Sequence, residues 1–488
     1  MASGQLTPAA NYFTLLIKAH ELYRREKEES TMSTDNVKED ILQTARRIVQ
    51  LGPICDSCLG RQFAMLSTGL TNADRGKALK TVLAMQASSV QEKELLEELA
   101  KSSKSARLGL GREGEDAPCW ACLREMNPEN LERWAEKAAD AISGLEYNTF
   151  LVGTRMSGLL AENEELLLAD GGSTHAEPLK SELNREVGKL VAKKTGKQVD
   201  FQRPEVTVLL NLEQMEVDLQ IASLFLRGRY RKLVRGIPQT RWPCRECRGK
   251  GCLRCHGTGR MYPESVDELI RPAVLEASRA EDTVFHGAGR EDIDARMLGS
   301  GRPFVVEAVR PKVRLLDLAK LEEEINRRAE GKVEVLDLAV SSSEEVEQLK
   351  SSPLEKTYSA LISFAEDVPE EKLKSGLNSI KGSIDQRTPA RVSHRRADKH
   401  RERKVLSADL VESSGRSARI IIRGDSGLYI KELISGDGGR TEPSLARILG
   451  IDAVVVELDV LDVGGKLHGA SSRNAEEDAA QAKQDGQG

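Results

Sequence analysis

The eight cysteines constrain the fold of this chain most strongly, because every one of them belongs to a CxxC pair. The first set joins "CDSC" to a distant "CWAC", whereas the second is the compact "CRECRGKGCLRC". A CxxC turn directs two thiolates to one point, and two such turns complete the tetrahedral sulfur shell that suits zinc. The sequence therefore predicts one or two structural zinc sites, with the ligands Cys55, Cys58, Cys119, Cys122, Cys244, Cys247, Cys252 and Cys255.

The compartment and the redox state of these cysteines follow from the rest of the composition. No apolar run approaches the roughly 20 residues of a membrane span, and no apolar signal segment opens the chain. We therefore expect a cytoplasmic protein without a membrane partner, in which disulfides are the less favoured use of cysteine. A pair of redox-active CxxC motifs is the alternative to zinc.

Length and periodicity predict an α+β protein of several domains. The chain has 488 residues, more than a single hydrophobic core usually spans. Helical spacing in 37–52 and 180–196, with strand-like runs at 148–156 and 205–233, indicates an α+β accessory region. The predicted order is a flexible extension at 1–36, an accessory domain at 37–235, a zinc knuckle at 236–262, a second α+β domain at 263–464 and a disordered tail at 465–488.

The charge pattern bears on the partner. A formal net charge of -5 argues against a nucleic-acid binder, but the basic residues are clustered. Residues 227–235 hold five Arg or Lys and no acid, and residues 391–404 hold seven against two acids. Local patches of this kind matter more than the total charge, because phosphate contacts act over about 10 Å at moderate salt.

One acidic loop is the candidate for chemistry. In "GREDIDARMLGSGRPFVVE", Asp292 and Asp294 lie among glycines and the basic residues Arg290, Arg296 and Arg302. Positive neighbours favour the ionised carboxylate, and an ionised carboxylate can attack an electrophilic carbon. On this fragment alone, a turn with a surface salt bridge is the alternative.

Two tyrosines stand out in a chain with only 4% aromatic residues. Tyr358 precedes an apolar run in "EKTYSALI", and "GLYIKEL" brings Tyr429 and Lys431 to a strand-to-helix bend. Such tyrosines are candidates for stacking on nucleic-acid bases, although each can also be a core-edge residue. No GxxxxGK[ST] loop and no dinucleotide fingerprint is present, so we expect chemistry without an organic cofactor.

Taken together, these stretches resemble the archaeal tRNA pseudouridine synthases of the Pus-ten type. The similarity runs in order through "CDSCLGRQFA", "RGRYRKLVRGIPQTRW", the acidic loop, "TPARVSHRRADKHRERKV" and "YIKELISGDGGRTEPS". It implies that Asp292 is the nucleophile, because "GRED" matches the Gly-Arg-x-Asp motif of the superfamily, with Asp294 as a structural neighbour. It implies Lys431 as the basic partner, and Arg440 is a second candidate cation.

The resemblance also implies a fold, a substrate and a partner. The fold would be a pseudouridine synthase core with a mixed, largely antiparallel sheet flanked by helices, plus a zinc-binding region that contains a THUMP domain. The reaction would convert uridines 54 and 55 of tRNA to pseudouridine, with Tyr358 and Tyr429 contacting the substrate. The two basic runs would lie along the RNA, and the protein would act as a monomer.

Three other classes remain possible from the residues. A zinc protein that binds tRNA without catalysis would leave Asp292 dispensable. A DnaJ-like co-chaperone is suggested by "CRECRGKG", but the chain lacks the four half-repeats and the HPD motif of that family. A THUMP methyltransferase or thiolase would need a donor or nucleotide pocket, for which no glycine loop is placed.

Overall fold

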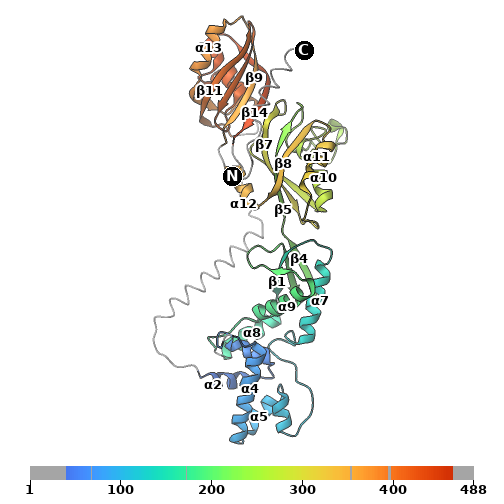
Figure 1. Cartoon of the computed structure of the whole chain (residues 1–488). Coiled ribbons are helices and arrows are strands. Elements are labelled where there is room, and N and C mark those ends of the chain that lie inside the picture. Colours follow the sequence, from blue (N-terminus) through green and yellow to red (C-terminus); the bar gives the residue numbers. More distant parts are fainter. Residues whose placement is uncertain (1–39, 68, 172, 352–353, 394–396, 465–488) are drawn as a thin grey trace, which may run out of the picture. The chain divides into compact units, whose positions relative to one another are not determined.

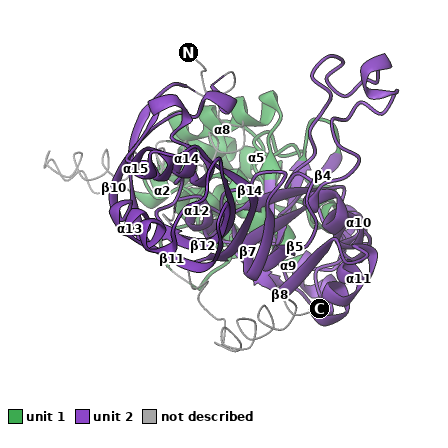
Figure 2. Cartoon of the chain, turned by 90° about the horizontal axis from the view of Figure 1, so that it is seen from above, with its two compact units in different colours: residues 1–135, 154–190, 211–215 green, residues 136–153, 191–210, 216–488 purple. Residues whose placement is uncertain are grey.

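The computed structural model describes residues 40–464 except 68, 172, 352–353 and 394–396 (Figure 1). The extension predicted at 1–36 and the tail predicted at 465–488 lie outside the described residues. The chain divides into two compact units, and each is described by itself (Figure 2). Unit 1 comprises 1–135, 154–190 and 211–215, and unit 2 comprises 136–153, 191–210 and 216–488.

Unit 1 is helical in its N-terminal part. Asp40 caps the first described helix by accepting a hydrogen bond from the Leu42 amide at 3.0 Å, which confirms the helix predicted there. Helices α3 and α4 cross with their backbones in contact, since a Cβ at Gly60 would lie 1.7 Å from the Asn72 carbonyl oxygen. The helices up to the second cysteine pair are α2 (Ile41–Gln50), α3 (Asp56–Gly60), η2 (Arg61–Phe63), α4 (Asn72–Ser89), α5 (Lys93–Ala100) and α6 (Lys104–Gly109).

A small sheet with helices follows in the chain. Its strand order is β2-β1-β3-β4, and β1 pairs with β2 in parallel. Alternating buried and half-buried residues along β1 and β3 show that one face of the sheet is covered. The bounds are α7 (Pro128–Ile142), β1 (Thr149–Arg155), α8 (Gly158–Gly171), α9 (Leu179–Thr195), β2 (Gln198–Val199), β3 (Val206–Asn211) and β4 (Glu216–Ile221).

A ten-stranded sheet dominates unit 2. Its order is β13-β10-β11-β12-β9-β14-β7-β5-β8, and β6 pairs with β7. The pairing of β14 with β7 is parallel and the other pairings are antiparallel, which confirms the mixed, largely antiparallel sheet. The strands are β5 (Leu224–Lys232), β6 (Asp282–Gly287), β7 (Arg296–Val309), β8 (Val333–Ser341), β9 (Lys356–Phe364), β10 (Gly382–Arg387), β11 (His400–Ser414), β12 (Ser417–Gly424), β13 (Thr441–Glu442) and β14 (Ala453–Val463).

Helices flank this sheet as expected. Helices α10 and α11 pack together beside β8, and α13 packs beside β11 (Figure 1). The buried core joins apolar residues of both the helices and the strands, so it holds the sheet as one body. The helices are η3 (Leu253–Cys255), α10 (Val266–Ser278), α11 (Leu318–Arg328), α12 (Ser343–Ser351), α13 (Glu370–Ser379), η4 (Ala390–Val392), α14 (Ile430–Ser435), η5 (Asp437–Gly439) and α15 (Leu445–Leu449).

The predicted boundary at residue 235 separates a strand from its sheet. Strand β5 pairs with β7 through Leu224–Ala308 to Lys232–Met297, and with β8 on its other side. Its residues alternate between buried and half-buried positions along the whole strand. Strand β5 therefore belongs to the large sheet, and the chain enters that sheet before the knuckle rather than after it.

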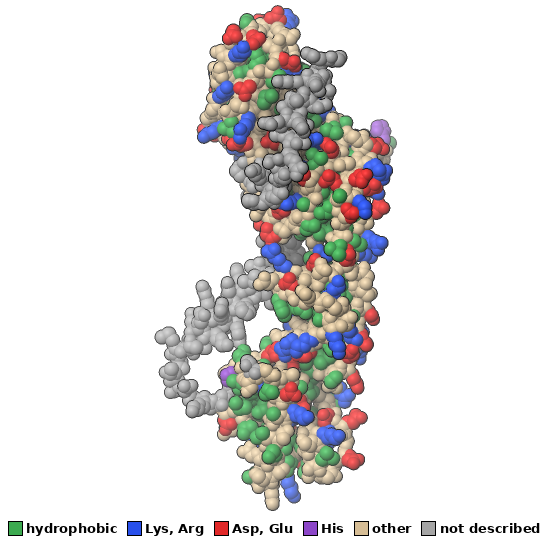
Figure 3. All heavy atoms as spheres, in the orientation of Figure 1, with side chains coloured by type: hydrophobic (Ala, Val, Ile, Leu, Met, Phe, Trp, Pro, Cys, Tyr) green, Lys and Arg blue, Asp and Glu red, His purple; other side chains and the backbone are tan. Residues whose placement is uncertain are grey.

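The surface matches a mixed charge composition. On the face in Figure 3, basic and acidic side chains are interspersed over the described residues. None of the described helices has both the length and the apolar composition needed to cross a membrane.

Candidate active site and cysteine clusters

The loop between β6 and β7 carries Asp292, and three side chains donate hydrogen bonds to its backbone carbonyls. The ammonium of Lys232, a fully buried residue of β5, donates to the Asp292 carbonyl at 3.1 Å. Arg302 of β7 donates to the Ala288 carbonyl at 2.7 Å, and the side-chain amide of Gln239 donates to the Gly289 carbonyl at 2.9 Å. Lys232 and Arg302 belong to strands of the sheet, and Gln239 belongs to the segment that follows β5. The loop is therefore fixed to the sheet at several points.

The acid directly before Asp292 is part of this support. Glu291 is buried and accepts hydrogen bonds from Arg302 Nε and from the Tyr230 hydroxyl, both at 2.9 Å. Lys232 Nζ lies 3.7 Å from the other carboxylate oxygen of Glu291. Burial and the charge of Glu291 raise the pKa of Tyr230 well above its usual value, so this phenol stays a donor. Glu291 thus anchors the loop, while the next side chain points elsewhere.

The carboxylate of Asp292 is 34% exposed and faces two cations from distant parts of the chain. Arg391 Nη1 lies 3.1 Å from Asp292 Oδ2, and Lys431 Nζ lies 3.6 Å from the same oxygen. Lys431 is closer to Asp294, at 2.6 Å from its Oδ2. The predicted Lys431 partner is therefore shared between the two acids, and Arg391 is the nearer cation of Asp292.

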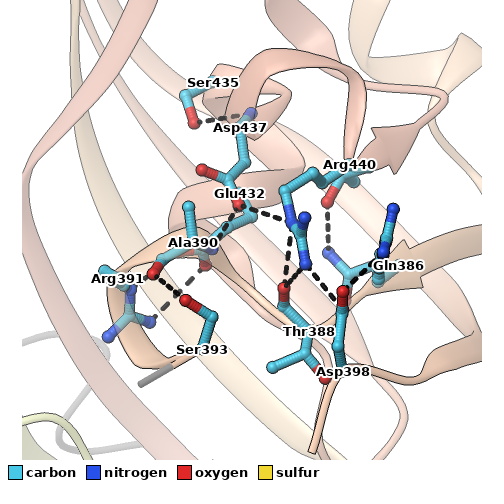
Figure 4. Close-up of polar contacts among 12 residues, drawn as sticks. Gln386, Thr388, Ala390, Arg391, Ser393, Asp398, Glu432, Ser435, Asp437 and Arg440 are labelled. Atoms are coloured by element: carbon cyan, nitrogen blue, oxygen red, sulfur yellow. Dashed lines mark hydrogen bonds and ion pairs between the residues drawn. The ribbon is translucent and has the colours of Figure 1, made fainter.

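Two neighbours of Asp292, Asp294 and Arg391, have shifted pKa values. Burial opposes ionisation of Asp294, but the hydrogen bond and charge of Lys431 outweigh it and lower the pKa of Asp294. Burial likewise opposes the charge on Arg391, yet the hydrogen bond of Glu432 and the charge of Asp292 raise the pKa of Arg391. Arg391 Nε donates to Glu432 Oε1 at 2.7 Å (Figure 4). The guanidinium therefore lies between Glu432 and Asp292.

Arg391 was missed by sequence reasoning. It lies within the basic run 391–404, and its only signal was membership of that run. A distance of about a hundred residues in the chain separates it from Asp292, so no local spacing connects the two. A pairing of this kind becomes visible only when the sheet brings η4 beside the β6–β7 loop.

Arg440, the second candidate cation, is directed elsewhere. Its Nη2 donates to the Thr388 carbonyl and to Asp398 Oδ1, each at 2.6 Å (Figure 4). These contacts connect the β13 end of the sheet to Thr388 before Arg391 and to Asp398 after it. Arg440 therefore supports the loop that carries Arg391 rather than facing Asp292.

The two predicted tyrosines occupy different settings. Tyr358 lies on β9 and is 8% exposed, and no hydrogen bond joins its hydroxyl to another described residue. Burial and the nearby charge of Asp292 raise the pKa of Tyr358 to about 12, against the opposing charge of Arg302. Tyr429 precedes α14, where Gln386 bonds its backbone amide at 2.9 Å and its carbonyl at 3.0 Å. Tyr358 is thus close enough to Asp292 for the charge of that carboxylate to affect its pKa.

Arginines that neighbour Asp292 in the sequence are engaged with other groups. Arg296 Nη2 lies 2.7 Å from Asp459 Oδ2, and Arg302 is paired with Glu291. The guanidinium of Arg290 lies 5.8 Å from the centre of the Trp242 ring. The positive environment expected from these neighbours is supplied by Arg391 and Lys431 instead.

The basic run 227–235 is also committed to the protein. Arg227 pairs with Glu345 at 2.8 Å, Arg229 donates to the Gly301 carbonyl at 2.8 Å, and Arg231 pairs with Glu334 at 3.2 Å. These arginines connect β5 to α12, to the start of β7 and to β8. Their guanidinium groups already have protein partners, so they are poorly placed to bind RNA phosphates.

Each set of four cysteines gathers its sulfurs into one cluster. Within each set the four sulfurs lie within 4.8 Å of one another, and all eight cysteines are free thiols. The Cys55–Cys122 separation is 3.7 Å and the Cys244–Cys252 separation is 3.9 Å. A tetrahedral zinc ion with sulfur ligands at about 2.3 Å separates those sulfurs by about 3.8 Å. Both sets therefore fit a closed four-sulfur metal site.

We expect purified protein to carry two metal ions per chain, and Cys58→Ser to remove one of them. Cys58 is fully buried, so the loss should lower the free energy of unfolding. A fall of at least about 3 kcal/mol is expected, against the roughly 10–16 kcal/mol that structural zinc supplies in small domains. Elemental analysis and thermal melting measure both effects. An unchanged metal content in this variant would contradict the assignment.

A buried lysine lies close to the β6–β7 loop that carries Asp292. Lys356 of β9 is 8% exposed, and its ammonium has no hydrogen bond or ion pair with another described residue. A Cβ at Gly289 would lie only 3.3 Å from that nitrogen. Burial, together with the charge of Arg302, lowers the pKa of Lys356 to about 8, although Glu291 opposes the shift. Such a charge is costly at neutral pH unless a ligand compensates it.

Lys356→Met is expected to stabilise the folded protein at pH 7. The lowered pKa corresponds to a gain of up to about 3 kcal/mol when the buried charge is removed. Between about pH 8 and pH 10.5 the native lysine loses its proton before the unfolded one does, so wild-type stability rises and the gain shrinks. Urea unfolding at pH 7 and near pH 10 measures the difference in free energy of unfolding between the wild type and the variant. The exposed Lys404→Met serves as control, and an equal shift there would refute the explanation.

Comparison with known proteins identifies the family. The description "Pus10 THUMP domain, archaeal" matches residues 134–211, and "Pus10, C-terminal" matches residues 225–464. A protein of Methanothrix thermoacetophila named "tRNA pseudouridine synthase Pus10" is 64% identical over 436 residues, covering 88% of this chain and 96% of its own length. The chain belongs to the archaeal Pus10 family.

Other Pus10 proteins and one solved structure extend the comparison. A Pus10 protein of Halorubrum lacusprofundi is 44% identical over 88% of this chain and 97% of its own length. The C-terminal Pus10 match begins at residue 225, within β5, in agreement with the sheet. A solved pseudouridylate synthase is 13% identical, with a TM-score of 0.19, and covers 62% of this chain and 88% of that one. The family assignment rests on the sequence relatives.

Proposed function

We propose that this Pus10 chain is a tRNA pseudouridine synthase that converts uridines 54 and 55, with Asp292 as the nucleophile. The observation that carries the proposal is the carboxylate of Asp292, held on a fixed loop with Arg391 Nη1 at 3.1 Å and Lys431 Nζ at 3.6 Å. The loop carries the Gly-Arg-x-Asp spacing of the superfamily. Named relatives at up to 64% identity support the same activity.

The reaction is an isomerisation, so the protein need only supply an attacking group, a proton route and a pocket. The bond between N1 of uracil and C1′ of ribose breaks, the base turns over, and C5 bonds to C1′. The proton that C5 loses is balanced by the one that N1 gains. Asp292 attacks either the base or the ribose, and both routes need its ionised form. Arg391 and Lys431 already lie beside that carboxylate, so the protein need not reorganise during the reaction.

Tyr358 would contact the base that is turned out of the RNA. Its ring is buried on β9 near Asp292, and its hydroxyl has no hydrogen bond among the described residues. With a pKa of about 12, the hydroxyl keeps its proton and can donate to a carbonyl or to a phosphate. Stacking on such a ring offsets part of the few kcal/mol that unstacking a base costs. Tyr429 would bound the other side of the pocket.

The remaining parts of the molecule fit a tRNA substrate. The THUMP region at 134–211 would bind tRNA away from the reacting base, as shape recognition of folded RNA requires. The two cysteine clusters would hold structural zinc, since four sulfur ligands leave no position open. We expect a cytoplasmic monomer without an organic cofactor.

Incubating purified protein with an unmodified tRNA transcript tests the proposal directly. Mass-spectrometric mapping of pseudouridine should find product at positions 54 and 55 without any added nucleotide or methyl donor. Binding of tRNA without product at either position would instead favour a tRNA-binding protein that lacks catalysis. Product at other positions alone would retain the reaction and overturn the assigned targets.

A further inference from the structure

We propose that residues 241–262 form a second RNA-binding surface that contacts tRNA phosphates beside the loop of Asp292. These residues are the part of the predicted 236–262 module that surrounds the sulfur cluster, and they are called the knuckle. Naming tRNA as the ligand rests on the proposed function; the surface itself rests on the charges and contacts of the knuckle. Within these residues there are six Arg or Lys and one acid, Glu246, in a chain whose net charge is -5. The knuckle is thus a local reversal of the overall charge.

Five of the six basic side chains of the knuckle are available for a ligand, whereas Arg260 pairs with Glu268 at 3.0 Å. These five are exposed, and none has a side-chain hydrogen bond or ion pair with another described residue: Arg241, Arg245, Arg248, Lys250 and Arg254. The basic run 227–235 offers the opposite case, because Arg227 and Arg231 are paired with acids. From the sequence, both this run and the run 391–404 were expected to lie along the RNA. In the structure, exposed basic side chains without a protein partner are found on the knuckle, whereas Arg227 and Arg231 of the run are paired.

The backbone of the knuckle explains why its side chains face outward. A Cβ at Gly251 would lie 2.6 Å from the Gly257 carbonyl oxygen, and one at Gly259 would lie 2.3 Å from the Gly249 carbonyl oxygen. The two turns therefore pack backbone against backbone around the sulfur cluster. With no apolar core of its own to fill, even Leu253 is 95% exposed. Compact knuckles of this kind that present basic side chains are established binders of RNA.

The base of the knuckle is attached to the loop that carries Asp292. The rings of Trp242 and Tyr262 meet edge to face at 5.7 Å, and Arg290 lies 5.8 Å from the Trp242 ring centre. Gln239, just before the knuckle, donates to the Gly289 carbonyl at 2.9 Å. All of these residues belong to unit 2. A strand of RNA with its target base at Asp292 therefore has the knuckle as a neighbour.

Neutralising three of these charges together tests the proposal: Arg245→Gln, Arg248→Gln and Lys250→Gln. Each phosphate contact contributes about 0.7–0.9 to the slope of log affinity against log salt. The triple variant should lower that slope by about 2, weaken tRNA binding at least about tenfold at moderate salt and raise the KM for tRNA. Metal content is measured in the same samples, so that a collapsed knuckle is recognised.

A matched control removes three exposed lysines elsewhere: Lys93→Gln, Lys104→Gln and Lys350→Gln. These residues also lack side-chain partners among the described residues, so the control separates a local contact from the effect of net charge. An equal loss in both triples, or an unchanged slope with metal retained, would overturn the knuckle proposal. If the triple variant lost metal, Arg241→Gln with Arg254→Gln would replace it, with a slope change of about 1.5 expected.

The two proposals fail in different ways. A wild-type protein that forms pseudouridine, with a salt slope unchanged by the triple variant, would leave the enzyme intact and remove the knuckle surface. If the wild-type protein forms no product but the triple variant still lowers the salt slope of tRNA binding, the knuckle surface would stand and the enzyme proposal would be overturned. The binding series can also be run in an Asp292→Asn background, where turnover cannot disturb it.

Discussion

Asp292→Asn is expected to abolish pseudouridine formation, with a fall in rate of at least about 10⁴-fold, because it removes the carboxylate that is proposed to attack the substrate. Binding of tRNA should change little, since the asparagine keeps the size of the side chain and Lys232 bonds only the backbone carbonyl of this residue. Single-turnover assays with saturating protein measure the rate, and filter binding measures the affinity.

Asp294→Asn is the matched control for that experiment. Asp294 is 68% exposed and binds Lys431 at 2.6 Å, so its loss should free Lys431 toward Asp292 and reduce the rate no more than about tenfold. If Asp294→Asn were inactive while Asp292→Asn retained product, the roles of the two acids would be exchanged. If both variants retained product, the nucleophile would lie elsewhere.

The second large effect is expected at Arg391, which lies nearer to Asp292 than Lys431 does. Replacing it by methionine alone would leave Glu432 buried without its partner, which itself destabilises a protein. The informative variant is therefore Arg391→Met with Glu432→Gln, in which no buried charge is left unpaired. Its kcat should fall about 100-fold with a smaller change in KM, as for the loss of one preorganised electrostatic partner.

Arg440→Met controls for the alternative cation. Arg440 bonds the Thr388 carbonyl and Asp398, and these contacts support the loop rather than the carboxylate. We expect a lower melting temperature and a fall in kcat of no more than about tenfold. A larger loss of kcat in Arg440→Met than in the Arg391 double variant would restore Arg440 as the main cation.

Short-range patterns in the sequence were sufficient for several parts of the molecule. The CxxC spacing predicted both sulfur clusters, since each turn places two thiols side by side. The compact second cluster forms within one short segment, whereas the first needs the fold to bring Cys119 and Cys122 to Cys55 and Cys58. Helical periodicity with Asp40 before Ile41 predicted α2, and apolar alternation predicted β1 and β5. The family motifs, read in order, predicted the Pus10 family and the character of its sheet.

Other parts depend on long-range contacts. Strand β5 was grouped with the preceding domain because its neighbours in the sequence lie there, whereas its neighbours in space are β7 and β8. Basic residues of the 227–235 run suggested an RNA contact because the sequence does not show which acid each one meets. Arg227 and Glu345 are more than a hundred residues apart in the chain and are brought together by the fold.

By itself, the sequence predicted the CxxC pairs of the two sulfur clusters, the family and the position of the candidate nucleophile, because these are carried by residue types at fixed local spacing. Tertiary structure decided which charges surround that nucleophile. Arg296 and Arg302, close in the chain, turn to Asp459 and Glu291, and Arg391 and Lys431 arrive from other strands. Coulomb energy falls with distance in space and not along the chain, so only the folded sheet could select these partners.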